Sequence, residues 1–178
     1  MIGQMSSTAR FLWMMQVLEV NPDDSILEIG CGVGVGVSLI AARLESGRIT
    51  AIDRSPSALN KAVSRNEKYI LERKAEFFLT DIARFKQGIR EYDKIFAFNV
   101  NVFWTKKSIA QEVQVIQSHL SKNGRLYLFY QPPSEQALDV LRVALTEKLN
   151  VQGLLVTDSV YDQAVRSCCI MAKAKKPD

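Results

Sequence analysis

The fold is decided by residues 26–36, which read ILEIGCGVGVG. A short apolar run that contains the acid Glu28 breaks into glycines at every second position from Gly30 to Gly36. The following residues, 37–44, are apolar at helical spacing, so the unit is predicted to be a strand, a glycine loop and a helix. Glycines are needed where a backbone approaches a ligand without intervening Cβ atoms, and where φ turns positive. The loop is therefore predicted to hold a ligand.

Strand and helix patterns alternate along the rest of the chain. Ser55 with Pro56 behind it predicts a helix start, as do Thr105 and Ser134, because Ser and Thr side chains cap helices. Two short runs at the end, joined by a small polar segment at 158–163, predict an antiparallel pair. The expected strands are 25–29, 48–52, 75–79, 92–98, 125–130, 151–157 and 164–172, and the expected helices are 6–20, 37–44, 55–70, 105–120 and 134–145. This alternation predicts an α/β fold with a mostly parallel sheet between two helical layers.

Length and composition favour one globular domain over residues 1–178. Residues 1–24 are predicted to form an N-terminal helix or lid, with Phe11 and Trp13 as its apolar contacts, and residues 173–178 a flexible tail. No apolar run approaches membrane-spanning length, and no charged leader precedes a long apolar core, so we expect a cytoplasmic protein without a membrane contact. The sequence sets no oligomeric state.

The cysteines exclude a disulfide framework. The chain has three cysteines, two of which are the neighbours Cys168 and Cys169, and one histidine, His119. Their spacing is not that of a metal site, so no metal ligand is predicted. Cys31 lies in the glycine loop, where a small buried cysteine is the ordinary interpretation.

Polar residues follow four of the predicted parallel strands. Asp53, Asp81, Asn99 and Gln131 each stand at such an end. Ligands bind at the carboxyl ends of strands in sheets of this kind, so these residues and the glycine loop are expected on one rim. The dinucleotide pattern G-x-G-x-x-G is not satisfied, because the chain has valine where the third glycine would stand.

The arrangement Glu28-x-Gly30-x-Gly32-x-Gly34, with acids after the second and third strands, resembles the class I S-adenosylmethionine-dependent methyltransferases. The resemblance covers essentially the whole chain. It implies a three-layer Rossmann-like fold whose seven-stranded sheet has the order 3-2-1-4-5-7-6, with strand seven antiparallel. It also implies S-adenosylmethionine as the cofactor.

The resemblance assigns cofactor contacts by position. Glu28 would support the loop and the amino end of the cofactor, Asp53 would accept from both ribose hydroxyls, and Asp81 would accept from the adenine amino group. The full set of expected cofactor-binding residues is Glu28, Gly30, Cys31, Gly32, Gly34, Asp53, Arg54, Ser55, Asp81, Ile82 and Asn99. Asp53 and Asp81 could instead cap the following segments, and the glycines could serve only a tight turn.

Residues 99–104 are where acceptor preference is expected. Asn101, Phe103, Trp104 and Tyr130 are candidate substrate contacts, although aromatic residues beside a helix start are as often core. The chain lacks the Pro-Pro-aromatic sequence that amino-methylating relatives often carry after an Asn or Asp at this place. His119, the one histidine, is expected at the end of the sheet opposite the rim, too far away to act as a base there. We therefore name no catalytic residue. An acceptor that is nucleophilic without a histidine base, such as an amine, a thiol or an easily ionised hydroxyl, is therefore favoured.

Three classes of function remain open. The first is methyl transfer to a small molecule, which we favour because no appended domain is present to hold a macromolecule. The second is methylation of RNA or protein, which would require basic residues to converge on one face; nucleic acid is possible but not favoured as a partner. The third is a non-catalytic S-adenosylmethionine-binding protein. The basic residues that would have to converge are Arg65, Lys68, Arg73, Lys74, Lys106 and Lys107.

Overall fold

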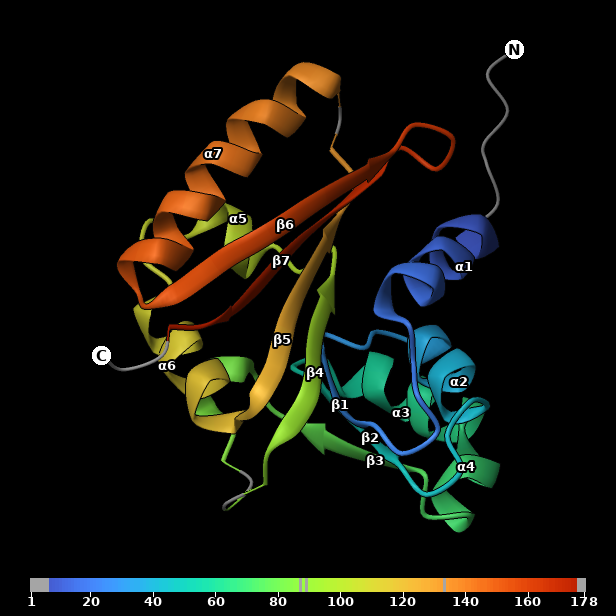
Figure 1. Ribbon diagram of the computed structural model, residues 1–178. Helices are drawn as coiled ribbons and strands as arrows, with labels where there is room; N and C mark the ends of the chain where they lie inside the picture. The colour runs from blue at the N-terminus through green and yellow to red at the C-terminus, as the bar shows by residue number, and fades with distance from the viewer. Residues whose placement is uncertain (1–6, 87, 89, 133, 176–178) are drawn as a thin grey trace.

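Seven strands form one sheet in the order β3-β2-β1-β4-β5-β7-β6 (Figure 1). The computed structural model describes residues 7–86, 88, 90–132 and 134–175. β1 pairs in parallel with β2 and β4, β2 with β3, and β4 with β5, whereas β7 is antiparallel to both β5 and β6. The predicted sheet, including its order and its antiparallel strand, is confirmed. The strands are β1 (Ser25–Ile29), β2 (Arg48–Asp53), β3 (Ala75–Leu79), β4 (Tyr92–Phe98), β5 (Leu120–Tyr130), β6 (Leu154–Asp162) and β7 (Ser167–Ala174).

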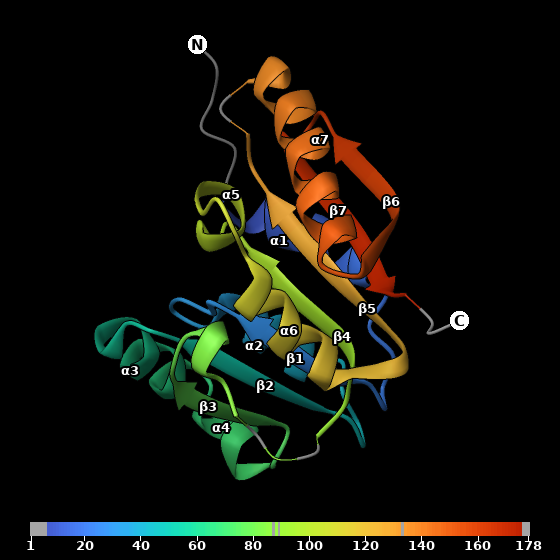
Figure 2. The same cartoon turned by 90° about the vertical axis from the view of Figure 1, so that its left-hand side faces the viewer.

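Helices cover both faces of the sheet, giving three layers (Figure 2). One face packs against α1 (Ser7–Leu18), α2 (Val35–Ala41), α3 (Pro56–Arg65) and α4 (Glu67–Leu71). The other packs against the 3-10 helix η1 (Ile82–Arg84), α5 (Val102–Thr105), α6 (Ala110–His119) and α7 (Glu135–Val151). In β1, Ile26 belongs to the first core and Leu27 to the second, and both side chains are 0% exposed. This burial on both faces explains the continuous apolar run, as expected of a central parallel strand.

Two of the three predicted helix caps are confirmed. The hydroxyl of Ser55 accepts a hydrogen bond of 3.3 Å from the N–H of Ala58, and Pro56 follows at the first helical position. Ser134 accepts 3.2 Å from the N–H of Ala137 at the start of α7. Each cap satisfies one of the N–H groups that a helix start leaves without a partner.

The predicted cap at Thr105 is wrong, because Thr105 ends α5. Its hydroxyl donates 3.0 Å to the backbone oxygen of Asn101, one helical turn earlier. The residues from 102 onward therefore form two helices, and α6 begins only after Ile109. A short first helix lets the chain leave the carboxyl end of β4 before α6 runs back along the sheet.

The predicted helix 55–70 is split at Asn66, and the split serves the glycine loop. Asn66 is 0% exposed and has φ −110°, outside the helical region. Its amide donates 3.0 Å to the oxygen of Gly34 and 2.8 Å to that of Ala62, and it accepts 2.7 Å from the Ser38 hydroxyl. A buried amide with all of these partners stabilises the loop conformation, at the cost of helix continuity between α3 and α4.

Several predicted boundaries near the C-terminus are also wrong. Residues 158–162 belong to β6 rather than to a polar connection, and β5 begins at Leu120, five residues early, through an irregular start opposite Tyr92. Lys173 and Ala174 belong to β7, so the predicted tail starts too early; residues 176–178 lie outside the described part. β6 is an edge strand, and its solvated face carries polar residues that the sequence pattern assigned to a connection. In the interior strands β5 and β7, strand pairing extends into polar residues that the apolar pattern did not include.

The N-terminal helix is present, but Trp13 is not part of a lid. Trp13 is 8% exposed and packs edge-on against Phe129 of β5, with ring centroids 5.7 Å apart. Phe11 is partly buried against Phe98, with centroids 5.4 Å apart. Residues 1–6 of the predicted lid lie outside the described residues. α1 is therefore packed onto the sheet, with Trp13 in the first core.

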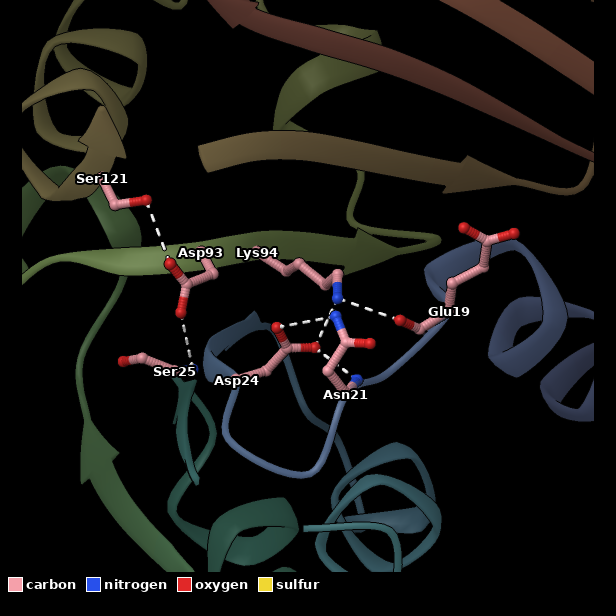
Figure 3. Close-up of polar contacts among 7 residues, drawn as sticks. All are labelled: Glu19, Asn21, Asp24, Ser25, Asp93, Lys94 and Ser121. Carbon is pink, nitrogen blue, oxygen red and sulfur yellow. Dashed lines mark hydrogen bonds and ion pairs between the residues drawn. The ribbon is translucent and has the colours of Figure 1, made fainter. Parts of the chain in front are cut away.

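A buried ion pair fixes the end of α1 to the amino end of the sheet (Figure 3). Lys94 of β4 donates to the carboxylate of Asp24, and the two side chains are 10% and 7% exposed. The same ammonium group donates 3.0 Å to the backbone oxygen of Glu19, directly after α1. Asp24 also accepts 2.7 Å from the N–H of Asn21. A cation at a helix C-terminus is stabilised by the helix dipole, so Lys94 joins three segments at once.

Candidate functional site

A cavity of about 580 Å³ lies at the carboxyl ends of the strands. Its walls come from the ends of β1, β2 and β4, from η1, and from the residues of α5 and the start of α6. Of the predicted cofactor-binding residues, those that line it are Gly30, Asp53, Arg54, Asp81, Ile82 and Asn99. The structure therefore brings together on one rim residues that lie far apart along the chain, as predicted.

The glycine loop has the left-handed backbone that its sequence predicts. Gly30, Gly32 and Gly34 have φ of 71°, 55° and 77°. A Cβ at Gly30 would lie 2.6 Å from Cγ2 of Val100, whereas a Cβ at Gly32 would meet nothing within 4 Å. Gly30 is therefore required by the protein's own packing, and Gly32 leaves open space beside the loop.

Glu28 lies buried beneath this loop. It is 3% exposed, its Oε2 has no hydrogen-bond partner among the described residues, and a Cβ at Gly36 would lie 2.6 Å from Oε1. Burial, and secondly the charge of Asp53, raise the pKa of Glu28 to about 8, while a hydrogen bond from the backbone N–H of Val37 opposes the rise. The site thus holds an acid that a nearby positive charge would stabilise in its ionised form.

Asp53 ends β2, and backbone hydrogen bonds orient both of its carboxylate oxygens. Oδ2 accepts 2.8 Å from the N–H of Gly32, and Oδ1 accepts 2.8 Å from the N–H of Ser55. A carboxylate has about four acceptor positions, so each oxygen can still accept one more hydrogen bond. The two backbone contacts join the glycine loop to the start of α3 and fix the direction of those remaining acceptors.

Asp81 begins η1 and is half-buried. Its Oδ1 accepts 3.1 Å from the N–H of Arg84, so the alternative capping role is present. Its Oδ2 lies 3.7 Å from Nε of the largely exposed Arg84 side chain. Ile82 is 3% exposed; it packs in the second core and also lines the cavity. Both oxygens face groups of Arg84, but a carboxylate has about four acceptor positions, so the cap leaves Asp81 able to accept from a ligand in the cavity that it lines.

Asn99 follows β4 with φ 55°, a conformation that Asn tolerates better than most residues. Its side chain pairs with Gln131, which follows β5. Oδ1 of Asn99 accepts 2.9 Å from the Gln131 backbone N–H, and Nδ2 donates 3.3 Å to Oε1 of Gln131. The amide pair joins the ends of β4 and β5 at the rim.

The predicted substrate residues separate into two groups. Asn101 lines the cavity, but Phe103 is 0% exposed and belongs to the second core, so its assignment as a cavity wall is wrong. Trp104 and Tyr130 contact each other with ring centroids 4.4 Å apart, outside the cavity lining. The buried Nε1 of Trp104 has no partner among the described residues.

Three other predicted site residues, Cys31, Gly34 and Ser55, do not line the cavity. Cys31 is 6% exposed, and burial raises its thiol pKa far above the usual range, so it is an inert buried thiol. Ser55 is the cap of α3, and Gly34 packs against Ala62 of that helix. These residues hold the loop rather than face the cavity.

Sequence reasoning missed a polar pair in the cavity wall. Lys106 donates 2.6 Å to Oε1 of Glu112, whose side chain is 3% exposed. Glu112 lies on the same helical face as Ile109, Val113 and Ile116, and an acid within an apolar stripe was the available signal.

His119 lies at the amino end of the sheet, as predicted. It is 6% exposed, and its ring centroid lies 5.1 Å from that of Phe85 and 6.2 Å from that of Tyr92.

Within the described residues, no three His, Cys, Asp or Glu side chains group closely enough to hold a metal ion. No helix of that part of the chain is long and apolar enough to span a membrane.

A family model described as a methyltransferase domain matches residues 26–124, more than half of the chain. The chain belongs to this methyltransferase family. Its fold and its relatives are those of the class I S-adenosylmethionine-dependent enzymes, and its cofactor is S-adenosylmethionine.

Individual relatives agree with this assignment. The methyltransferase is 34% identical over 100 residues to a probable cobalt-precorrin-6B C(15)-methyltransferase (decarboxylating) of Methanococcus maripaludis. That match covers 56% of this chain, and the chain spans about half the length of the relative, 50%. Two solved structures share the fold. One is an S-adenosylmethionine-dependent methyltransferase from Aquifex aeolicus, with TM-score 0.75, 15% identity and coverage of 94% and 98% of the two chains. The other is magnesium protoporphyrin IX methyltransferase from Synechocystis PCC 6803 with bound cofactor, with TM-score 0.69, 16% identity and coverage of 95% and 77%.

The residues of the methyltransferase fit this cofactor. S-adenosylmethionine carries a sulfonium and an ammonium charge, and the unpartnered Glu28 oxygen lies in the same loop region. Its ribose presents two adjacent hydroxyls, and Asp53 has two oriented acceptors left. The open space beside Gly32 leaves room for close approach to the backbone.

Proposed function

We propose that this methyltransferase transfers a methyl group to a small-molecule acceptor, within the single domain formed by residues 1–178. The observation that carries the proposal is the cavity of about 580 Å³ at the strand ends. This volume lies within the range of about 300–1,000 Å³ that small-molecule sites occupy. The M. maripaludis relative is named for a small-molecule substrate, which agrees with this choice.

The alternative of an RNA or protein substrate depends on basic residues converging on one face. Arg65 and Lys68 stand on or beside the helices that pack against the first core, whereas Lys106 precedes α6 on the second core. Lys106 is also paired with Glu112. A nucleic-acid footprint needs charge clustered on one face, so this separation favours the small molecule.

We assign the residue roles as follows. Glu28 and the loop from Gly30 to Gly34 hold the methionine part of the cofactor, with Cys31 buried within that loop. Asp53 accepts from the ribose hydroxyls, with Arg54 and Ser55 beside it. Asp81 and Ile82 contact the adenine, Asn99 lies toward the methionine and acceptor, and Asn101 lies at the acceptor side of the cavity.

When bound, S-adenosylmethionine supplies an electrophilic methyl group on a sulfonium that is already a good leaving group. The chain's residues then act mainly by orientation and by excluding water from the rim. Asp53, with its oxygens fixed by the N–H groups of Gly32 and Ser55, sets the position of the ribose. Because His119 lies at the other end of the sheet, we assign the acceptor to amines, thiols and easily ionised hydroxyls.

The test is methyl transfer from cofactor labelled on the methyl group to three separate pools: small metabolites, RNA and protein. We expect label in the small-metabolite pool only, with D53A reducing transfer because it weakens cofactor binding. D23A, which changes an exposed acid at the amino end, is the matched control and should leave transfer unchanged. Label found only in RNA or protein would contradict the proposal.

A further inference from the structure

Arg10 of α1 reaches the rim without an acidic partner. Among the described residues it makes no ion pair, and its buried Nε has no hydrogen-bond partner. Within the part of the chain that the structure describes, its side chain makes one hydrogen bond, of 2.9 Å from Nη1 to Oε1 of Gln131. Partial burial removes water from a guanidinium. This loss of hydration costs free energy unless an anion pairs with the charge.

The position of this guanidinium is fixed by aromatic rings. Its Cζ lies 5.2 Å from the ring centroid of Phe11 and 5.6 Å from that of Phe98. Phe98 ends β4 and lines the cavity. Stacking on two rings lowers the freedom of the side chain, so less is lost when an anion binds. The guanidinium is therefore oriented by two rings before any ligand arrives. One of these rings belongs to a residue of the cavity wall, although Arg10 itself does not line the cavity.

The amide of Gln131 is itself held in place. Its Oε1 also accepts 3.3 Å from Nδ2 of Asn99, and its Nε2 donates 3.4 Å to the oxygen of Val165 in the turn between β6 and β7. Hydrogen bonds through Gln131 thus connect Arg10 of α1 to the ends of β4 and β5 and to this turn. The hydrogen bond to Gln131 uses one N–H of the guanidinium. The N–H groups that remain include the buried Nε–H, which has no partner among the described residues.

We propose that Arg10 binds a carboxylate carried by the methyl acceptor. This inference rests on the proposed function. A guanidinium presents two parallel N–H groups that match a carboxylate, and a single cation matches a single negative charge. Phe11 and Phe98 form an apolar surface beside that charge. The acceptor class is therefore a small molecule with a carboxylate on a flat or apolar body.

The test uses benzoate and its neutral isostere benzamide as probes, on protein saturated with S-adenosylhomocysteine. Binding is measured by calorimetry for the wild type, R10M, R10K and the control R43M, which changes an exposed arginine next to α2. We expect the wild type and R43M to prefer benzoate by about tenfold, since a charge-assisted hydrogen bond is lost with benzamide. R10M keeps the apolar stem and should lose the preference, and R10K should keep part of it. Circular dichroism confirms that each variant is folded.

Four outcomes would overturn the inference. Equal binding of both probes to the wild type, or an unchanged preference in R10M, removes the subsite. A loss of S-adenosylhomocysteine affinity in R10M without a loss for 5′-methylthioadenosine would assign Arg10 to the cofactor's own carboxylate instead. Failure of the wild type to bind S-adenosylhomocysteine would overturn the proposed function and this inference together. Retained cofactor binding without benzoate preference would leave the proposed function intact.

Discussion

At the amino ends of β1 and β4, buried ionised side chains are paired within the chain, whereas at the carboxyl ends several polar groups have no partner among the described residues. Lys94 and Asp24 form the buried ion pair of Figure 3. Asp93 beside them accepts 3.0 Å from the N–H of Ser25 and 3.1 Å from the hydroxyl of Ser121. These contacts join α1, β1, β4 and β5.

The carboxyl edge differs in its acidic and basic side chains. Glu28 Oε2 and Arg10 Nε are buried without a partner among the described residues. The backbone there has positive φ at Gly30, Gly32 and Asn99. At the amino edge the neutral groups Tyr92 Oη and His119 Nε2 also lack a partner among the described residues, and Glu19 there has φ 47°. The contrast therefore lies in the acidic and basic groups, whose burial without a partner costs more than that of neutral groups. On that contrast we distinguish a structural edge at the amino ends from a proposed binding edge at the carboxyl ends, and the variants below test the distinction.

The largest effect is expected at the structural edge. K94M leaves the Asp24 carboxylate buried without its partner, so the free energy of unfolding should fall by about 3–5 kcal/mol. Urea unfolding measures this loss. The double variant K94M/D24N, which removes both charges, should recover part of it. Affinity of the folded protein for S-adenosylhomocysteine should not change. A loss of less than about 1 kcal/mol would mean that the pair is not a structural anchor.

The next effect is the pH dependence caused by Glu28. Because its pKa is raised from 4.5 to about 8, the folded state keeps a proton that the unfolded state releases between these pH values. Stability should therefore fall as pH rises through this window, by on the order of 3 kcal/mol between pH 5 and pH 8. In E28Q the contribution disappears. Urea unfolding of both proteins across this range measures the difference in slope, and parallel slopes would show that Glu28 is not buried as an unpaired acid.

A smaller effect is expected from Asp53, and on binding rather than on folding. D53A removes the carboxylate that we propose as the acceptor of two ribose hydroxyls, so affinity for S-adenosylhomocysteine should fall by about 1–3 kcal/mol. Calorimetry below the unfolding temperature measures it, with D23A as the control. Unchanged affinity in D53A would remove Asp53 from the site.

The smallest effects distinguish two glycines of the same loop. Both have positive φ, so an alanine at either position should cost about 1 kcal/mol of stability. G30A should cost more, because its Cβ would meet Val100 at 2.6 Å. G32A meets nothing in the protein within 4 Å, yet it should weaken cofactor binding if the cofactor lies on that open side. Thermal unfolding and calorimetry together test this, and full cofactor affinity in G32A would place the ligand elsewhere.

The sequence predicted the binding edge better than the structural edge, for a physical reason. Asp53 and Asp81 are marked by local signals, since each follows an apolar run and the ends of parallel strands share one edge. Lys94 and Asp24 pair across 70 positions, and Arg10 and Gln131 across 121. No local periodicity encodes such contacts. The break at Asn66 was missed for the same reason, because its partner Gly34 lies 32 residues away.

A crystal structure with S-adenosylhomocysteine tests the central claim most directly. We predict the ligand in the cavity at the carboxyl ends of the strands, with its ribose oxygens within hydrogen-bond distance of Asp53 and its amino-acid part against the loop from Gly30 to Gly34. A ligand bound away from this cavity, or one whose ribose makes no contact with Asp53, would contradict the account.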